Sequence, residues 1–365
     1  MKELINKSVL EIKPYIAGKP IEETKRQLGL KKVYKLASNE NPFGPSPKAL
    51  NSIKKCLSSL NRYPDSQNFY LRKALGKNFG LSPENFVLGN GSDELIDILI
   101  KTFVEPDENI VTAQTTFLEY EIVAQVNNRK VKKAPLRYFK YDLGAILKLL
   151  DKKTKLVFIA NPNNPTGTYV SKFEVDDFLK ALPKNVLVVF DEAYDTFIDV
   201  DDYPDSLSYL RMKKKNIILL KTFSKAYGLA GLRLGYAIAD KEAVSYMERV
   251  RQPFNVNMLA QAAGLAALED REFLKTSRKL TLEGKDYLYR QLSNMGLSFV
   301  PSAANFILID VESNGKELFK SMLKEGIIVR DMEQYGLNNY IRLTVGTQTE
   351  NRLAMQALKK VLRRK

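Results

Sequence analysis

The stretch Lys221–Tyr236, KTFSKAYGLAGLRLGY, combines the end of a strand with a reactive side chain. The apolar run just before it, Ile217–Leu220, is typical of a buried strand. A turn rich in hydroxyl groups follows and contains one lysine, Lys225, with Arg233 further along. A lysine amine can form a Schiff base, and hydroxyl and guanidinium groups bind phosphate. The pattern favours a site for a phosphorylated carbonyl compound; the alternative is an ordinary solvated loop lysine.

The composition excludes several classes of chemistry. The 365 residues are enough for two domains of ordinary size. With one cysteine, Cys56, and no histidine, the chain has no internal disulfide, no Ser-His-Asp or Cys-His mechanism and no histidine-ligated metal. Acid–base chemistry must therefore use Lys, Tyr, Asp or Glu. Because no apolar run reaches membrane-spanning length and the N-terminus lacks the apolar core of a signal peptide, we expect a cytoplasmic protein without a membrane partner or a metal.

The net charge of +15 raises the alternative of a nucleic-acid partner. The basic residues are scattered, however, acidic residues lie between them, and no basic motif is interleaved with aromatic residues. We therefore expect no nucleic-acid partner, and a basic surface that is solvated or attracts anionic substrates.

Between about residues 50 and 240, short apolar runs alternate with amphipathic helical patterns. This alternation predicts an α/β fold with a mainly parallel sheet that helices cover on both faces. One helix is expected over Asp93–Phe103, and another is expected to begin at Ser171, where Ser-Lys-Phe-Glu has the spacing of a capping box. The predicted strands are Asn85–Leu88, Asn109–Ala113, Lys155–Ala160, Val186–Phe190, Asn216–Leu220 and Gly235–Ala239.

The pattern changes after residue 240. A long helical region over about 241–296 leads to strands near Asn305–Val311 and Tyr340–Thr344 and to a last amphipathic helix. We expect three parts, which are an N-terminal arm (1–35), a large domain (36–240) and a smaller α+β domain (241–365) that packs with part of the arm.

Polar clusters follow several predicted strands, where open α/β sheets bind their ligands. Gly89–Glu94 is a glycine turn that runs into a helix, and its N–H groups and the Ser92 hydroxyl can cradle phosphate; a plain glycine turn is the alternative. Asn161–Gly167 contains two Asn-Pro steps, which force a rigid turn and favour a ligand role. Asp191 ends the apolar run Val186–Phe190 and needs a partner, because a lone buried carboxylate is costly. A cationic ring nitrogen suits it, and a helix N-cap is the alternative.

Three further side chains are candidates. Phe117 can stack on a planar ring, although an aromatic residue at such a position is more often core. Arg330 and Arg342 can form an anion clamp. The alternatives are a paired core charge for Arg342 and neutralisation of Arg330 by Asp331.

Together these motifs resemble the aspartate-aminotransferase-like, fold type I pyridoxal-phosphate enzymes and, within them, the histidinol-phosphate aminotransferases. The resemblance covers nearly the whole chain. In order, its motifs are IKPYIAGKPIEE, LASNENPFGPSP, RYPD, GNGSDELID, NPNNPTG, DEAY, TFSKAYGLAGLRLGY, ANFIL, GIIVRD and NYIRLTVGTQTEN.

The resemblance implies pyridoxal 5′-phosphate as cofactor and assigns residues to each part of it. Lys225 would form the Schiff base and move the proton at the substrate's Cα, while Asp191 would pair with the pyridinium nitrogen. Tyr194 and Asn164 would hydrogen-bond the 3′ oxygen of the ring, and Phe117 would stack on the ring. The residues expected around the cofactor phosphate are Gly91, Ser92, Asp93, Thr222, Ser224 and Arg233, with Tyr63 from the other subunit of a homodimer.

The resemblance also implies a reaction of histidine biosynthesis, in which histidinol phosphate and 2-oxoglutarate become imidazole-acetol phosphate and glutamate by a ping-pong mechanism. Arg342 would bind the α-carboxylate of glutamate and then the substrate phosphate. Arg330 would bind the side-chain carboxylate or strengthen phosphate binding, and Tyr15, Asn41 and Asn305 would make lesser contacts. The alternatives are an aromatic or broad-specificity aminotransferase or a threonine-phosphate decarboxylase on the same scaffold, and a cofactor-free binding protein.

Overall fold

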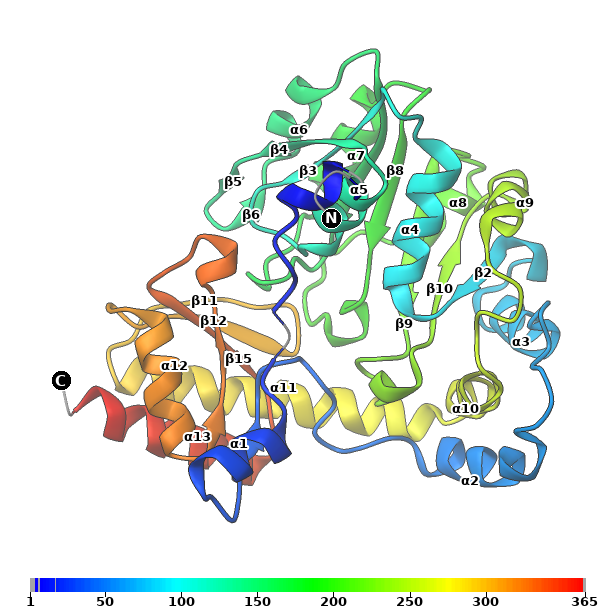
Figure 1. Ribbon diagram of the computed structural model, residues 1–365. Coiled ribbons are helices and arrows are strands. Elements are labelled where there is room, and N and C mark those ends of the chain that lie inside the picture. Colours follow the sequence, from blue (N-terminus) through cyan, green and yellow to red (C-terminus); the bar gives the residue numbers. More distant parts are fainter. Residues whose placement is uncertain (1–3, 6, 17, 364–365) are drawn as a thin grey trace.

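A seven-stranded sheet forms the centre of the larger part of the computed structural model, which describes residues 4–5, 7–16 and 18–363 (Figure 1). Its strand order is β2-β10-β9-β8-β7-β3-β4, in which β10 runs antiparallel to both neighbours and the other pairs are parallel. The prediction of a mainly parallel sheet is therefore confirmed. The strands are β2 Phe86–Gly89, β3 Asn109–Ala113, β4 Lys130–Ala134, β7 Thr154–Ala160, β8 Leu187–Asp191, β9 Ile217–Thr222 and β10 Gly235–Ile238.

Helices cover both faces of this sheet, and every residue of β2, β3 and β10 is buried, as expected for strands between two helical layers. The predicted capping box is confirmed, because the Ser171 hydroxyl accepts from Glu174 N while the Glu174 carboxylate accepts from Ser171 N. The helices are α2 Pro47–Cys56, α3 Phe69–Phe79, α4 Gly91–Phe103, α5 Glu119–Val126, α6 Leu143–Leu149, α7 Lys172–Ala181, α8 Ser206–Arg211, α9 Lys241–Val250 and α10 Met258–Leu268.

A second, antiparallel sheet lies beside the first, in the order β11-β12-β15-β14, and has a hydrophobic core of its own. The long helix α11 runs from beside α10 to this smaller sheet (Figure 1). The elements here are α11 Arg271–Asn294, β11 Phe299–Val300, β12 Phe306–Asp310, α12 Gly315–Lys324, β14 Arg330–Asp331, β15 Tyr340–Thr344 and α13 Gln348–Leu362.

The segment after α1 (Ile21–Leu28) joins the smaller sheet region to the larger part. Its strand β1, Tyr34–Lys35, pairs in parallel with β13, Ile327–Ile328. The chain then crosses toward the larger sheet through residues 36–41. The remaining elements are the hairpin strands β5 Leu136–Arg137 and β6 Lys140–Tyr141, and the 3₁₀ turns Lys7–Glu11, Leu57–Ser59, Pro83–Asn85, Asp195–Phe197, Ala230–Leu232 and Glu333–Tyr335.

The helical region expected over about 241–296 consists of three helices. Val244 and Met247 of α9 and Ala260 of α10 are buried in the same core as the seven-stranded sheet. The division of the chain into domains at residues 35 and 240 stays a prediction. Within the described residues, none of the helices has the length and apolar character needed to cross a membrane.

Candidate active site

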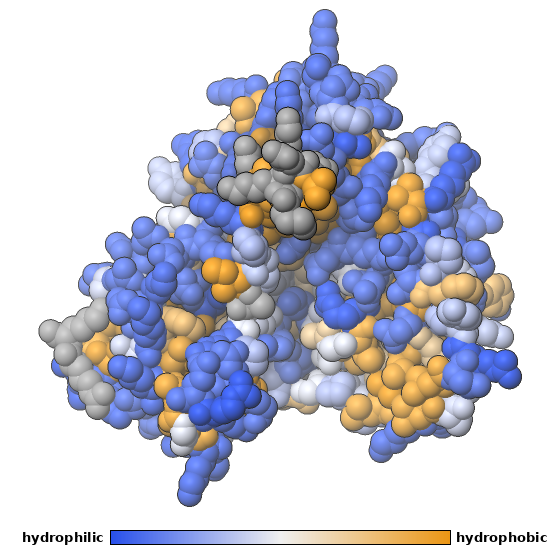
Figure 2. All heavy atoms as spheres, in the orientation of Figure 1, coloured by the Kyte–Doolittle hydropathy of each residue, from blue (hydrophilic) through white to orange (hydrophobic). Residues whose placement is uncertain are grey.

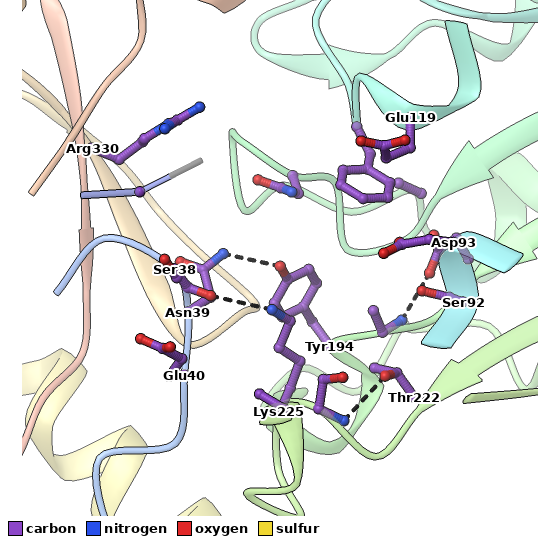
Figure 3. A pocket seen from close by; sticks show the side chains of 18 of the residues that line it. Ser38, Asn39, Glu40, Ser92, Asp93, Glu119, Tyr194, Thr222, Lys225 and Arg330 are labelled. Carbon is purple, nitrogen blue, oxygen red and sulfur yellow. Dashed lines mark hydrogen bonds between the residues drawn. The ribbon is translucent and has the colours of Figure 1, made fainter. Parts of the chain in front are cut away.

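A cavity of about 480 Å³ lies between the carboxyl ends of the parallel strands and the smaller sheet (Figure 3). It forms there because β2, β7, β8 and β9 all end at the same edge, and each is followed by one of the polar clusters. The predicted site residues that line it are Tyr15, Ser92, Asp93, Phe117, Asn164, Asp191, Tyr194, Thr222, Ser224, Lys225, Arg233, Arg330 and Arg342.

Lys225 enters the cavity from the turn after β9. Its Nζ donates to the backbone oxygen of Ser38 at 3.2 Å and lies 5.8 Å from the centre of the Tyr194 ring. Burial, helped by the nearby Arg342 guanidinium, lowers the pKa of the Lys225 amine to about 8. The amine is therefore neutral at little cost near physiological pH, which is the state needed to attack a carbonyl carbon.

Asp191 is the last residue of β8 and is buried at the inner end of the cavity. Tyr120 Oη donates to its Oδ2 at 2.7 Å, and Ala193 N donates to its Oδ1 at 3.2 Å. Burial nevertheless raises the pKa of Asp191 to about 6. The residues that the structure describes include no ion pair to this carboxylate, so a planar cation in the cavity would be its natural partner.

An anion cradle lies at the N-terminus of α4. Arg233 Nη2 donates to Asp93 Oδ2 at 2.8 Å, beside Gly91. A Cβ added at Gly91 would lie 2.6 Å from Arg233 Nη2, and one added at Gly235 would lie 2.7 Å from Ser92 N. Glycine at both places lets the strand and the helix start approach closely. The free N–H groups of the first helical turn, together with Arg233, suit a phosphate group.

The two arginines of the smaller sheet form a second anion site across the cavity. They are directly opposite each other in the pairing of β14 with β15, and both are buried. Arg342 donates to Asn164 Oδ1 and, at 2.7 Å, to the backbone oxygen of Ala37, but its buried Nε has no acceptor. Arg330 donates to Gln334 Oε1 at 3.1 Å and lies 5.5 Å from the centre of the Tyr15 ring. Two buried guanidinium groups and an unused donor indicate an anionic ligand.

The comparisons with known proteins agree with this arrangement. The family model for aminotransferase class I and II matches residues 31–358. The chain belongs to this aminotransferase family. It is 47% identical to a histidinol-phosphate aminotransferase of Moorella thermoacetica over 97% of this chain and 92% of that protein. It is 45% identical to one of Anaeromyxobacter sp. (strain Fw109-5), over 98% and 99% of the two chains.

A solved structure gives the same result in three dimensions. It is the crystal structure of a histidinol-phosphate aminotransferase from Sinorhizobium meliloti in complex with pyridoxal-5′-phosphate, with a TM-score of 0.91 and 29% identity. The match covers 99% of this chain and 98% of that one. The fold type I architecture expected from the motifs is therefore confirmed for this aminotransferase.

Four of the predicted contacts of this aminotransferase are absent from the cavity wall. One of them, Gly91, lies beside Arg233 at the start of α4. Asn41 donates to Ala226 O and to Ser277 Oγ, both at 2.8 Å, and so braces the turn that carries Lys225. Asn305 is buried behind the wall. Tyr63 lies outside the cavity, 81% exposed and stacked on Phe254 with ring centres 4.7 Å apart.

The sequence did not indicate several of the cavity-lining side chains, among them Tyr120 and Asn39. Tyr120 supports Asp191, and Asn39 lines the cavity and donates from Nδ2 to the hydroxyl oxygen of Tyr194 at 2.9 Å. Tyr120 could have been suspected, because it is an aromatic residue three positions after Phe117, which the sequence did indicate. No local signal marks Asn39, because its contact with Tyr194 spans 155 residues of sequence.

Proposed function

We propose that the chain is a pyridoxal-phosphate-dependent histidinol-phosphate aminotransferase. It would transfer the amino group of histidinol phosphate to 2-oxoglutarate, giving imidazole-acetol phosphate and glutamate. The observation that carries the proposal is the pair of buried arginines, Arg330 and Arg342, across the cavity from Lys225. The names of the full-length relatives support the same substrate. The cytoplasm is the proposed location on the sequence argument alone.

The residues of the cavity fit pyridoxal phosphate at each of its groups. The cradle of Ser92, Asp93 and Arg233 would hold the phosphate, with Thr222 and Ser224 beside it. Asp191 would pair with the pyridinium nitrogen, and Phe117 lies in the wall where a ring would stack. When bound, this cofactor supplies an electron sink for the charge that develops as the substrate's Cα proton leaves.

Side chains of this chain would carry out the proton transfer and bind the substrates. The pKa of the Lys225 amine is lowered to about 8. As a neutral amine, Lys225 can accept the proton from the substrate's Cα and then donate that proton to a different atom. Arg342 would orient the substrate by its phosphate or, in the other half-reaction, by the α-carboxylate of glutamate. Arg330 would bind the second negative charge. Because one cofactor would carry the amino group between two substrates that use the same arginines in turn, the proposed mechanism is ping-pong.

A panel of amino donors tests this proposal. We expect histidinol phosphate and glutamate to convert the loaded enzyme to its amine-carrying form in a single turnover. Histidinol without phosphate should react about 10²-fold more slowly, since it loses charge-assisted hydrogen bonds to two arginines. Arg330→Gln should reduce the ratio between the rates with histidinol phosphate and with histidinol. The control Arg352→Gln, which replaces an exposed arginine, should leave that ratio unchanged. Faster reaction with phenylalanine or aspartate, or release of carbon dioxide from threonine phosphate, would reject the substrate assignment.

We also propose that the enzyme is a homodimer in which Tyr63 reaches the partner's site. Its support is a group of large apolar side chains exposed near Tyr63, and Figure 2 shows apolar atoms gathered in this region at the lower right. Such a patch is typical of a protein interface. Its exposed members are Leu50, Leu57, Leu60, Phe69, Tyr70 and Phe254.

Subunit complementation tests the dimer. Tyr63→Ala and Lys225→Ala should each be strongly impaired as homodimers. After mixing and re-association, activity should return to about a quarter of the wild-type value, since half of the dimers are hybrids with one intact site. A mixture that stays as inactive as its components, while hybrid dimers are present by native mass spectrometry, would show that Tyr63 does not serve the partner's site.

A further inference from the structure

The hydroxyl oxygen of Tyr194 receives its hydrogen bond from the segment 36–41, which crosses from the smaller sheet region to the cavity. Asn39 Nδ2 donates to Tyr194 Oη at 2.9 Å, and both residues line the cavity (Figure 3). Asn39 lies in the crossing segment 36–41. At the start of this segment, both the N–H and the backbone oxygen of Leu36 are hydrogen-bonded to the smaller sheet region. The hydrogen bond from Asn39 to Tyr194 therefore links the smaller sheet region to the hydroxyl group of a tyrosine that lines the cavity.

Asn39 is itself held in place on all sides. It is 1% exposed, and its φ of 54° is in the left-handed region that asparagine tolerates better than most residues. Its N–H donates to Thr344 Oγ1 at 3.0 Å, and the Thr344 hydroxyl donates to Asn39 Oδ1 at 3.0 Å. Asn305 Nδ2 donates to the Asn39 backbone oxygen at 3.1 Å. Because Oδ1 is used by Thr344, the amide Nδ2 faces Tyr194.

This arrangement fixes the direction of the hydrogen bond at Tyr194. A phenol has one proton to donate, and its oxygen here already accepts from an amide. Among the described residues, no side chain or backbone oxygen accepts the Tyr194 proton. We propose that Asn39 is a positioning residue that commits the Tyr194 hydroxyl to donate its proton into the cavity, toward an anionic oxygen on the bound cofactor ring. The inference rests on the proposed function, because it needs pyridoxal phosphate in the cavity.

Other charges near Tyr194 act in parallel and must be kept constant. Arg342 approaches from β15, Lys225 from the turn after β9, Asp191 from the end of β8 and Asp93 from α4. The variants that test Asn39 leave all four in place. A role through Tyr194 can then be separated from a general change in the field of the cavity by repeating each variant in a Tyr194→Phe background.

Two replacements separate the possible effects of Asn39. Asn39→Gly removes the amide donor, adds no charge and suits the positive φ. Asn39→Asp keeps an acceptor for Thr344 but offers a carboxylate to Tyr194, which reverses the direction of the bond. The readout is the pH midpoint of the visible absorbance change of the cofactor-loaded protein, measured with the dissociation constant for pyridoxal phosphate.

We expect Asn39→Gly to raise the pH midpoint by about one unit, the size of one lost hydrogen bond, and Asn39→Asp to raise it further. In the Tyr194→Phe background, Asn39→Gly should shift the midpoint by less than about 0.3 units. Affinity for pyridoxal phosphate should fall as the pH midpoint rises. A purely structural role would instead lower the melting temperature and leave the midpoint unchanged.

Two outcomes overturn the inference in distinguishable ways. If the wild type shows a pH-dependent visible band but Asn39→Gly has the same midpoint, or shifts it equally in the Tyr194→Phe background, Asn39 does not act through Tyr194. If the wild type shows no such band with pyridoxal phosphate, the cofactor assignment itself is wrong and the role of Asn39 is wrong with it.

Discussion

Replacing Lys225 with alanine should abolish transamination while leaving the chain folded. We expect kcat to fall by at least about 10³-fold, because one side chain supplies both the covalent link to the cofactor and the proton transfer at Cα. The fold should persist, since the Lys225 Nζ makes one hydrogen bond to the protein, to Ser38 O, and burial already disfavours its charge. The measurement is single-turnover kinetics together with mass spectrometry after borohydride reduction, which fixes the cofactor to the wild type.

Two control variants decide how this result is read. Lys225→Arg keeps a positive charge but cannot form the covalent link, so it should be as inactive as the alanine variant. Lys172→Ala removes an exposed lysine at the start of α7 and should change neither turnover nor the reduced mass. Turnover by Lys225→Ala within tenfold of wild type, or a borohydride-fixed cofactor on that variant, would end the assignment.

Replacing Asp191 with asparagine should lower catalytic activity but raise the stability of the cofactor-free protein. We expect kcat/KM to fall by about 10²–10³-fold, because the protonated ring nitrogen would lose its buried counter-charge. The cofactor-free protein should instead become more stable relative to wild type at neutral pH. Burial raises the pKa of Asp191 from 3.8 to about 6, so the folded wild-type chain keeps a proton that the unfolded chain has released between these values.

The sign of the pH dependence follows from that difference. The cost of the buried Asp191 charge is absent below about pH 3.8 and complete above about pH 6, where it reaches about 3 kcal/mol. The stability advantage of Asp191→Asn should therefore grow as the pH rises from about 3.8 to about 6 and level off above that, as measured by denaturant unfolding of both cofactor-free proteins. With saturating pyridoxal phosphate the advantage should shrink or reverse. An advantage that is the same at pH 4.5 and pH 8 would contradict the buried-charge explanation.

The sequence predicted the strand ends well because their signal is local. An apolar run followed by a polar cluster, as at Val186–Phe190 and Asp191, defines both a buried strand and the position where it opens to a ligand. The strand β4 was missed for the opposite reason. As an edge strand it pairs on one side with β3, and its sequence Lys-Val-Lys-Lys-Ala carries charges that suit an exposed edge.

The candidate site was predicted where a residue lies at a strand end and missed where a residue supports another. Lys225, Asp191 and the cradle at Ser92 stand directly after strands, so their position follows from topology alone. Asn39 and Tyr120 reach their partners across 155 and 71 residues of sequence. Such contacts arise from tertiary packing, which no local periodicity encodes.

The crossing of residues 36–41 from the smaller sheet to the cavity limits how far the chain can be truncated. Its backbone oxygens accept from two side chains of the cavity, Arg342 at Ala37 and Lys225 at Ser38. A shortened version starting after Asn41 would leave both donors without acceptors, at about 1–3 kcal/mol each, and would expose the edge of β13 that β1 covers. Proteolytic trimming of this region would therefore remove part of the catalytic wall, and a minimal expression fragment has to begin upstream of it.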